Sequence, residues 1–221
     1  MAATRTEGAR TGLMAGGIAA IVFAVLFVVG FLLAADTPEG DESNREWIRH
    51  FADSDNRRMI VIGVFVIALA TLAFLIFLGA LRERLRTAVP GGEWLSTIAF
   101  ASGIVFVAML GVFALGVGSV SAGIEFADNP VPRDADILRG LDSLGFGAML
   151  VFGSASAGLL IITTSIVSGR AALLPRWLVV VGYVVGVLVI IGGVIFLPLA
   201  LFVLWMLAVG IVMISRSRAT V

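Results

Sequence analysis

The polar stretch Asp41–Arg58, DESNREWIRHFADSDNRR, separates two long apolar segments and decides how the chain must be laid out. Ser43 is followed three residues later by Glu46, which is the signature of a capping box and predicts a helix over about 44–53. Apolar side chains recur within it at spacings of three and four, which gives the helix one apolar face. About ten helical residues are too few to cross a bilayer. The stretch therefore predicts an interfacial amphipathic helix, with its aromatic side chains among the lipid headgroups.

Two roles are open for this short helix. It is either a connector that covers the ends of two spans, or a lid or docking surface on the outer face. His50, the only histidine, is expected on its polar face. Substitution at such a position usually costs less than about 0.5 kcal/mol of folding stability.

The composition of the chain is that of a polytopic membrane protein. Of 221 residues, 60% are hydrophobic and 14% are charged, whereas soluble domains are about 45–50% apolar and about 25% charged. The formal net charge is zero, so no overall basic field exists to attract nucleic acid. Cysteine is absent, which excludes disulfides and thiolate metal sites. All 15 basic residues are arginine, and this usage, with abundant alanine, glycine and valine, suggests a GC-rich bacterial genome.

The apolar segments predict an all-α fold, a bundle of six transmembrane helices forming a single membrane domain over 1–221. The first segment resembles a signal peptide, but it is longer than the usual apolar region and lacks a small-x-small cleavage site, so we expect it to be retained. The last apolar run, 177–214, would be about 57 Å long as one helix and must fold into two spans. The predicted spans are approximately 13–35, 59–81, 94–123, 143–168, 177–196 and 199–214.

The distribution of arginine predicts the orientation of these spans. With the N-terminus inside, nine arginines fall on the cytoplasmic side and six on the outer side, and arginine in short loops stays cytoplasmic. We therefore expect both termini inside, in the bacterial cytoplasmic (inner) membrane. The outer loops then carry twelve of the fifteen acidic residues. Any activity is expected on that face.

Several chemistries are excluded by what the spans lack. No charged residue or histidine lies in the middle of a predicted span, although such groups mark proton relays and ion pathways. A single histidine cannot supply the two ligands of a bis-histidine haem, and the absence of lysine excludes a retinal-type Schiff base. The segment Gly153–Gly158 looks superficially like the serine loop of intramembrane proteases, but no span supplies a base for a serine nucleophile. It is interpreted as a small-residue packing face. No cofactor, metal site or catalytic residue is predicted.

Two D-x-D triplets in the outer loops leave one enzymatic alternative open. Paired carboxylates can hold a divalent cation that bridges a phosphate, so a metal-assisted enzyme acting on a lipid-linked phosphate is conceivable. The simpler interpretation is that these aspartates cap helices. The outer-face candidates are His50, Asp53, Asp55, Glu125, Asp134 and Asp136. On the cytoplasmic side, the cluster Arg82, Arg84 and Arg86 is expected to contact anionic lipids.

Partners other than lipids are predicted only from small-residue faces. Gly12 with Gly16, and Gly182 with Gly186, are spaced for close helix contact, either within the bundle or with a second copy or a partner membrane protein. A second functional alternative is a small carrier of lipid-like or apolar molecules. It requires a cavity between helices lined by Thr71, Ser102, Ser119, Ser156 or Thr163.

Short basic turns carry a resemblance to a known kind of protein. With LRERLR at 81–86, Trp94-Leu95 and LPRWL at 174–178, the chain resembles an uncharacterised family of six-span bacterial integral membrane proteins. The resemblance implies topology and no catalytic residues. The sequence therefore predicts an integral membrane protein that acts as a binding, accessory or structural component, with the carrier and the metal-assisted enzyme as the two alternatives.

Overall fold

The computed structural model describes residues 2–88, 93–192 and 197–219, and within them every regular element is helical. A π-helix, η1, joins α5 to α6, so that these three elements form one continuous helical run. The elements are α1 (Ala2–Ala34), α2 (Asn44–Ala52), α3 (Ser54–Ala88), α4 (Glu93–Ala127), α5 (Ala135–Gly147), η1 (Ala148–Gly153), α6 (Ser154–Ala171), α7 (Arg176–Ile191) and α8 (Leu197–Ala219).

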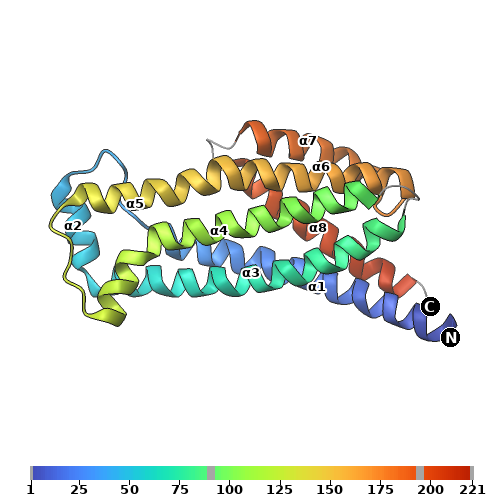
Figure 1. Ribbon diagram of the computed structural model, residues 1–221, viewed down its shortest axis with the longest axis horizontal. Helices are drawn as coiled ribbons and strands as arrows, with labels where there is room; N and C mark the ends of the chain where they lie inside the picture. The colour runs from blue at the N-terminus through green and yellow to red at the C-terminus, as the bar shows by residue number, and fades with distance from the viewer. Residues whose placement is uncertain (1, 89–92, 193–196, 220–221) are drawn as a thin grey trace.

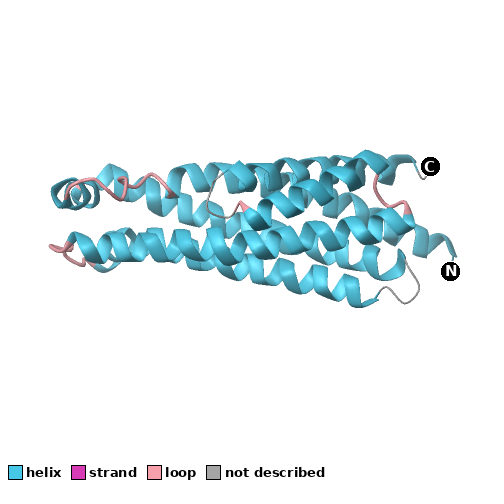
Figure 2. Cartoon of the chain, turned by 90° about the horizontal axis from the view of Figure 1, so that it is seen from above, coloured by secondary structure: helices cyan, strands magenta, loops and turns pink. Residues whose placement is uncertain are grey.

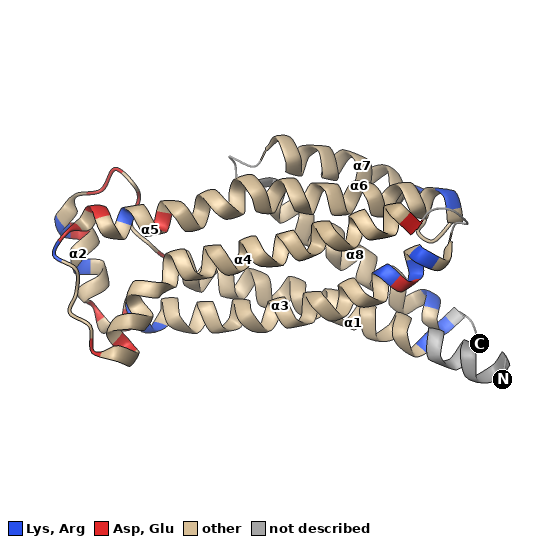
Figure 3. Ribbon diagram, viewed as in Figure 1, with Lys and Arg blue, Asp and Glu red and all other residues tan. Residues whose placement is uncertain are grey.

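The long helices lie side by side along one axis, with both termini at one end and the short α2 at the other (Figures 1 and 2). The α1 helix packs between α3 and α8, α4 packs against α3 and α6, and α7 packs against α6. The described Arg, Asp and Glu residues lie toward the two ends of the bundle, and the helices between them carry no charged residue (Figure 3). We call the end with α2 the distal cap (residues 35–58 and 125–142) and the opposite end the termini end.

Within the described residues, five helical segments are long and apolar enough to cross a membrane, which confirms the prediction of a helical membrane bundle at that level. The α7 helix is shorter, with 16 residues or about 24 Å, and it ends part-way along the bundle (Figure 1). The predicted end of the fifth span at 196 lies outside the described residues. The five segments are Arg10–Ala34, Ser54–Ala88, Glu93–Ala127, Ala135–Ala171 and Leu199–Arg218.

The long polar loop expected before the fourth span is largely helical. The α4 helix continues to Ala127, and α5 begins at Ala135 with Asp134 as its N-cap. Polar residues are tolerated here because α5 buries Leu138 and Gly145 while its other faces stay outside the core. The sequence did not indicate this helix because the charged residues Asp136, Arg139 and Asp142 interrupt its apolar positions.

The π-helix keeps the buried stripe of the run from α5 to α6 on one side. Buried residues follow one another at intervals of four through Gly145, Met149, Gly153 and Ala157. In a regular α-helix each such step advances about 40° beyond a full turn. The wider turn, in which the N–H of Ser154 donates to the carbonyl of Met149, offsets this drift. Both α5 and α6 can therefore face α4.

Most of the predicted small-residue faces are used within the chain. A Cβ added to Gly182 would meet Ser165 Oγ, and one added to Gly186 would lie 2.6 Å from the side chain of Ile162 and 3.1 Å from the carbonyl of Gly158. Gly16 approaches Ala80 and Met213 in the same way, whereas Gly12 has open space beside it. These glycines therefore let α6 and α7, and α1, α3 and α8, approach closely. A homo-oligomer or partner protein remains a prediction, and of the two faces only Gly12 is open.

Candidate functional site

The α2 helix of the distal cap begins as its sequence predicts. Ser43 is the N-cap, its Oγ accepts from the N–H of Glu46, and the Glu46 carboxylate accepts from Ser43 N–H at 3.0 Å. The hydrogen bonds from the Ser43 side chain and backbone lower the pKa of Glu46. The reciprocal bonds satisfy two N–H groups at the start of the helix, so α2 has a fixed start.

The apolar face of α2 packs on protein, which corrects the expectation that its aromatics lie among lipid headgroups. Trp47 and Phe51 are 1% and 3% exposed, and they form a small separate core with Ile60 of α3 and with Ala135 and Leu138 of α5. The residues that cover them are close in space and far apart in sequence, so the spacing within α2 could not distinguish burial in protein from burial in lipid.

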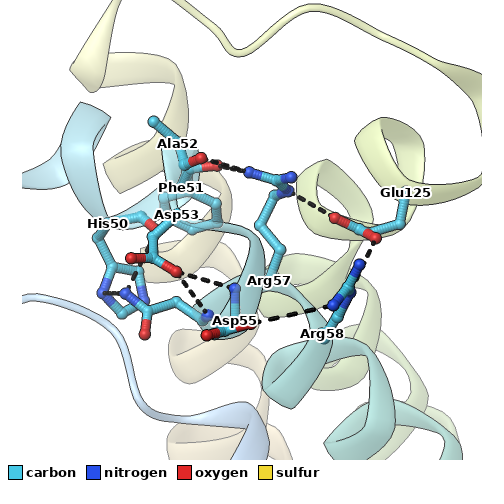
Figure 4. A network of polar contacts seen from close by, with 9 residues as sticks. His50, Phe51, Ala52, Asp53, Asp55, Arg57, Arg58 and Glu125 are labelled. Carbon is cyan, nitrogen blue, oxygen red and sulfur yellow. Dashed lines mark hydrogen bonds and ion pairs between the residues drawn. The ribbon is translucent and has the colours of Figure 1, made fainter.

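Arg57 ties the end of α2 to the bundle (Figure 4). Its Nη1 donates to the carbonyls of Phe51 at 2.9 Å and Ala52 at 2.7 Å, and its Nε donates to Glu125 Oε1 at 2.8 Å. The side chains of Arg57 and Glu125 are only 12% and 20% exposed. A cation beside the last carbonyls of a helix also complements the helix dipole. The contact therefore joins α2, α3 and α4 at one point.

Arg139 holds the beginning of α2 in a similar way. Its guanidinium donates to the carbonyl of Glu42 and to Asn44 Oδ1, both at 2.6 Å, and lies over the ring of Trp47 at 5.7 Å. Trp47 Nε1 in turn donates to the carbonyl of Glu39 at 3.1 Å. Sequence reasoning assigned Arg57 and Arg139 only to the loop charge count, because backbone carbonyls and side chains distant in sequence, such as Glu125, are partners that no local motif reports.

His50 is half-buried, which corrects the expectation of an exposed position on the polar face. The Asn56 amide Nδ2 lies 3.1 Å from His50 Nδ1, and the ring packs edge-on against Phe51. Because the amide nitrogen placed beside the ring donates, Nδ1 accepts and the ring proton is assigned to Nε2. Burial lowers the pKa of His50, opposed by the nearby carboxylates of Asp36, Asp53 and Glu42.

The two D-x-D triplets begin helices. Asp53 Oδ1 accepts from the N–H of Asp55 at 2.8 Å, and Asp134 Oδ1 accepts from the N–H of Asp136 at 2.9 Å. Asp55 and Asp136 are exposed in the first turns of α3 and α5, where a negative charge suits the helix dipole. Among the residues that the structure describes, no group of three or more His, Asp or Glu is arranged to hold a metal ion.

The arginine cluster at the termini end divides into three different environments. The Arg82 guanidinium lies 4.7 Å from the centre of the Phe100 ring, and Arg86 is paired with Glu83 at 3.3 Å on the surface. Arg84 instead lines a small, partly open pocket between α1, α3, α6 and α8, together with Arg216. Sequence reasoning placed the three arginines in one class, because helical spacing alone does not say which neighbour each of them meets.

The hydroxyls expected to line a carrier cavity do not converge on one. Thr71, Ser156 and Thr163 donate to carbonyls of their own helices at 3.0, 2.8 and 2.7 Å. Ser102 is buried, and Ser119 is exposed beside an open pocket near the distal cap. Hydroxyls bonded within their own helix are typical of packed transmembrane segments.

Comparison of the chain with protein-family models, with curated proteins and with solved structures gave no match.

Proposed function

We propose that this protein is a six-span integral membrane protein of the bacterial cytoplasmic membrane that acts as a binding or accessory component. The observation that carries the proposal is the filling of the bundle axis by interlocked aromatic rings. Phe23, Phe74, Phe106 and Phe202 come from four different helices, and all are 0% exposed. Their ring centroids lie 4.8 to 6.4 Å apart, within the range of favourable aromatic pairs.

This aromatic core continues toward the distal cap. Phe31 stacks on Phe113 at 5.3 Å, and Phe146 meets Phe113 edge-on at 5.2 Å. A carrier needs a cavity at mid-depth that its substrate can enter, and close-packed rings leave no such path. The packed axis therefore favours a binding or structural role over the carrier.

The arrangement of the chain supports six passes with both termini inside. The termini lie at the same end of the bundle (Figure 1), which requires an even number of passes, and α7 with α8 forms the last pair. The termini end carries most of the arginines, as the cytoplasmic side of a membrane protein does (Figure 3). This orientation places the distal cap outside the cytoplasm, where its clamped helix forms a fixed polar surface for a partner.

Cysteine accessibility tests the packed axis directly, since the natural chain has no cysteine. We expect Ser102→Cys and Thr163→Cys, both at buried positions, to resist a water-soluble maleimide in intact membranes. Asp128→Cys, exposed in the distal cap, is the positive control. Rapid labelling at either buried position would mean that water reaches the axis, and the carrier would then be the better hypothesis.

A reporter fused after Arg218 tests the orientation. We expect cytoplasmic activity of the reporter, with a second fusion in the loop at Asp128 giving the periplasmic signal. A periplasmic signal after Arg218 would contradict the pairing of α7 with α8 as two passes.

A further inference from the structure

The pocket at the termini end combines apolar walls with two cationic side chains. It is lined by Leu13 of α1, by Arg84 with Leu81 and Leu85 of α3, and by Arg216 with Val209 and Met213 of α8. The remaining walls come from α6 and the residues after it, Thr164, Ser168, Leu173 and Leu174. No acidic side chain is among the residues that line the pocket, and Arg84 and Arg216 are its two charged side chains.

Arg84 differs from Arg82, which lies over the Phe100 ring, and from Arg86, which pairs with Glu83. Among the described residues, its guanidinium makes no hydrogen bond or ion pair, although the side chain is half-buried. Arg216 donates to the carbonyl of Ala172 at 2.7 Å, which fixes its guanidinium at the end of α6. One arginine is thus positioned by the fold, and the other remains available to a ligand.

Thr164 provides a second, independent sign that the pocket has an occupant. Its side chain is 0% exposed, and its Oγ1 has no hydrogen-bond partner in the described structure. Leaving a buried hydroxyl unpaired usually costs about 1–3 kcal/mol, and mid-helix threonines commonly avoid this cost by donating to the preceding turn. Thr163, its neighbour, does so. A ligand atom in the pocket that forms a hydrogen bond with the Thr164 hydroxyl would remove this cost.

We propose that this pocket binds the phosphate group of an anionic phospholipid. Phosphate oxygens accept from arginine in the fork geometry that guanidinium offers, and they also accept from a hydroxyl such as that of Thr164. The cavity of about 30 Å³ holds two or three water-sized groups, so the phosphate oxygens enter while the acyl chains stay at the apolar rim. The inference rests on the proposed membrane location, and it assigns a ligand class to the termini end.

The test compares ligands on the purified full chain in a neutral detergent. Binding is followed by native mass spectrometry and by the rise in melting temperature. We expect phosphatidylglycerol to bind and to raise the melting temperature. Diacylglycerol, which lacks the phosphate, and inorganic phosphate, which lacks the chains, should have little effect at the same concentration. An equal effect of inorganic phosphate would show a site for soluble anions, and an equal effect of diacylglycerol would show a site that ignores the headgroup. Either result overturns the proposal.

Matched variants locate the site on the protein. Arg84→Gln should weaken phosphatidylglycerol binding about tenfold or more, as expected for the loss of one charge-assisted contact. Arg86→Gln removes the same charge two residues away, outside the pocket, and should weaken it less than about twofold. Equal losses of phosphatidylglycerol binding in both variants would mean that the lipid responds only to the surface charge of α3. This result would contradict a binding site in the pocket.

Thr164→Val keeps the shape of the side chain and removes the hydroxyl. It tests the site independently of the arginine variants, in case one of them folds poorly. The lipid-free melting temperature should rise, because an unpaired buried hydroxyl is gone, while the affinity for phosphatidylglycerol should fall severalfold. Unchanged affinity would exclude the hydroxyl as a ligand and contradict the proposed site. The cysteine labelling of the axis and the reporter fusion after Arg218 do not depend on lipid binding. A negative result in the lipid experiments can therefore be distinguished from a failure of the proposed function.

Discussion

Arginine has different surroundings at the two ends of the bundle. In the distal cap, Arg57 and Arg139 are largely enclosed and donate to backbone carbonyls at the two ends of α2. At the termini end, Arg86 pairs with Glu83 on the surface, and Arg84 lines a pocket without a hydrogen-bond or ion-pair partner among the described residues. Arginine thus fixes structure where carbonyls converge on it, and we propose that it binds a ligand where they do not. The count of arginines on each side predicts orientation in a membrane, but it cannot separate these two uses.

The strongest challenge to the comparison is removal of the aromatic anchor of the distal cap. Trp47→Ala should lower the free energy of unfolding by about 3 kcal/mol or more, because the indole is 1% exposed and also carries Arg139 above its ring. Trp94→Ala, at a position 60% exposed near the termini end, is the control and should cost less than about 1 kcal/mol. Thermal unfolding in detergent measures both. Equal losses would mean that the cap is not held as described.

The next largest effect should come from the clamp at the end of α2. Arg57→Gln should cost about 2–3 kcal/mol, since it removes charge-assisted bonds to two carbonyls and leaves the Glu125 carboxylate poorly compensated. Arg58→Gln is the matched control. Arg58 is 65% exposed and its contacts lie at 3.8 and 3.9 Å, so its loss should cost less than about 0.5 kcal/mol. Hydrogen exchange should show faster exchange of α2 amides in Arg57→Gln alone.

A pH titration of thermal stability tests the half-buried position of His50 in the distal cap. The pKa of His50 is lowered in the folded protein, so below about pH 6.5 the unfolded chain takes up the proton first. The contribution of His50 to stability is therefore complete above pH 6.5 and is lost as the pH falls toward the folded pKa. Between pH 7.5 and 5.5, the melting temperature of the natural protein should fall more than that of His50→Gln. All other titrating groups are common to the two proteins, so parallel curves would refute a perturbed His50.

The smallest effect is expected from the exposed carboxylates. Replacing Asp53, Asp55, Asp134 and Asp136 together with asparagine should leave helix content unchanged and cost less than about 0.5 kcal/mol per position, because asparagine caps a helix as well as aspartate does. Circular dichroism and thermal unfolding check this. A collapse of the fold would show that the charge of these residues, and not their capping geometry, supports the distal cap.

What the sequence could predict is set by the range of the interactions involved. The capping box at Ser43 and Glu46 is local, and it is present as predicted. The length and apolar character of the long helices are also local properties, so the membrane bundle was predictable. The clamp of Arg139 depends on residues far away in the chain, as the contact between Arg139 and Glu42 shows. No periodicity within one segment reports such a contact.

The pocket at the termini end was beyond prediction for a similar reason. Arg84, Thr164 and Arg216 come from three different helices, and each is unremarkable within its own segment. Only the absence of a partner for the Thr164 hydroxyl separates it from Thr163, and that requires side-chain coordinates. A buried hydroxyl without a partner is thus a signal that structure supplies and sequence does not.

The short α7 helix gives the molecule two different hydrophobic thicknesses. The uncharged segment Met59–Leu81 of α3 rises about 35 Å, whereas the whole of α7 rises about 24 Å. We therefore expect a bilayer with a hydrocarbon core of about 30 Å to thin beside α7, and beside α3 we expect it to thicken or the helix to tilt, at a cost of a fraction of a kcal/mol per ångström. Lipids with shorter chains relieve this strain only on the α7 side. The protein should consequently gather such lipids along one flank, and it should distribute unevenly between membrane regions of different thickness.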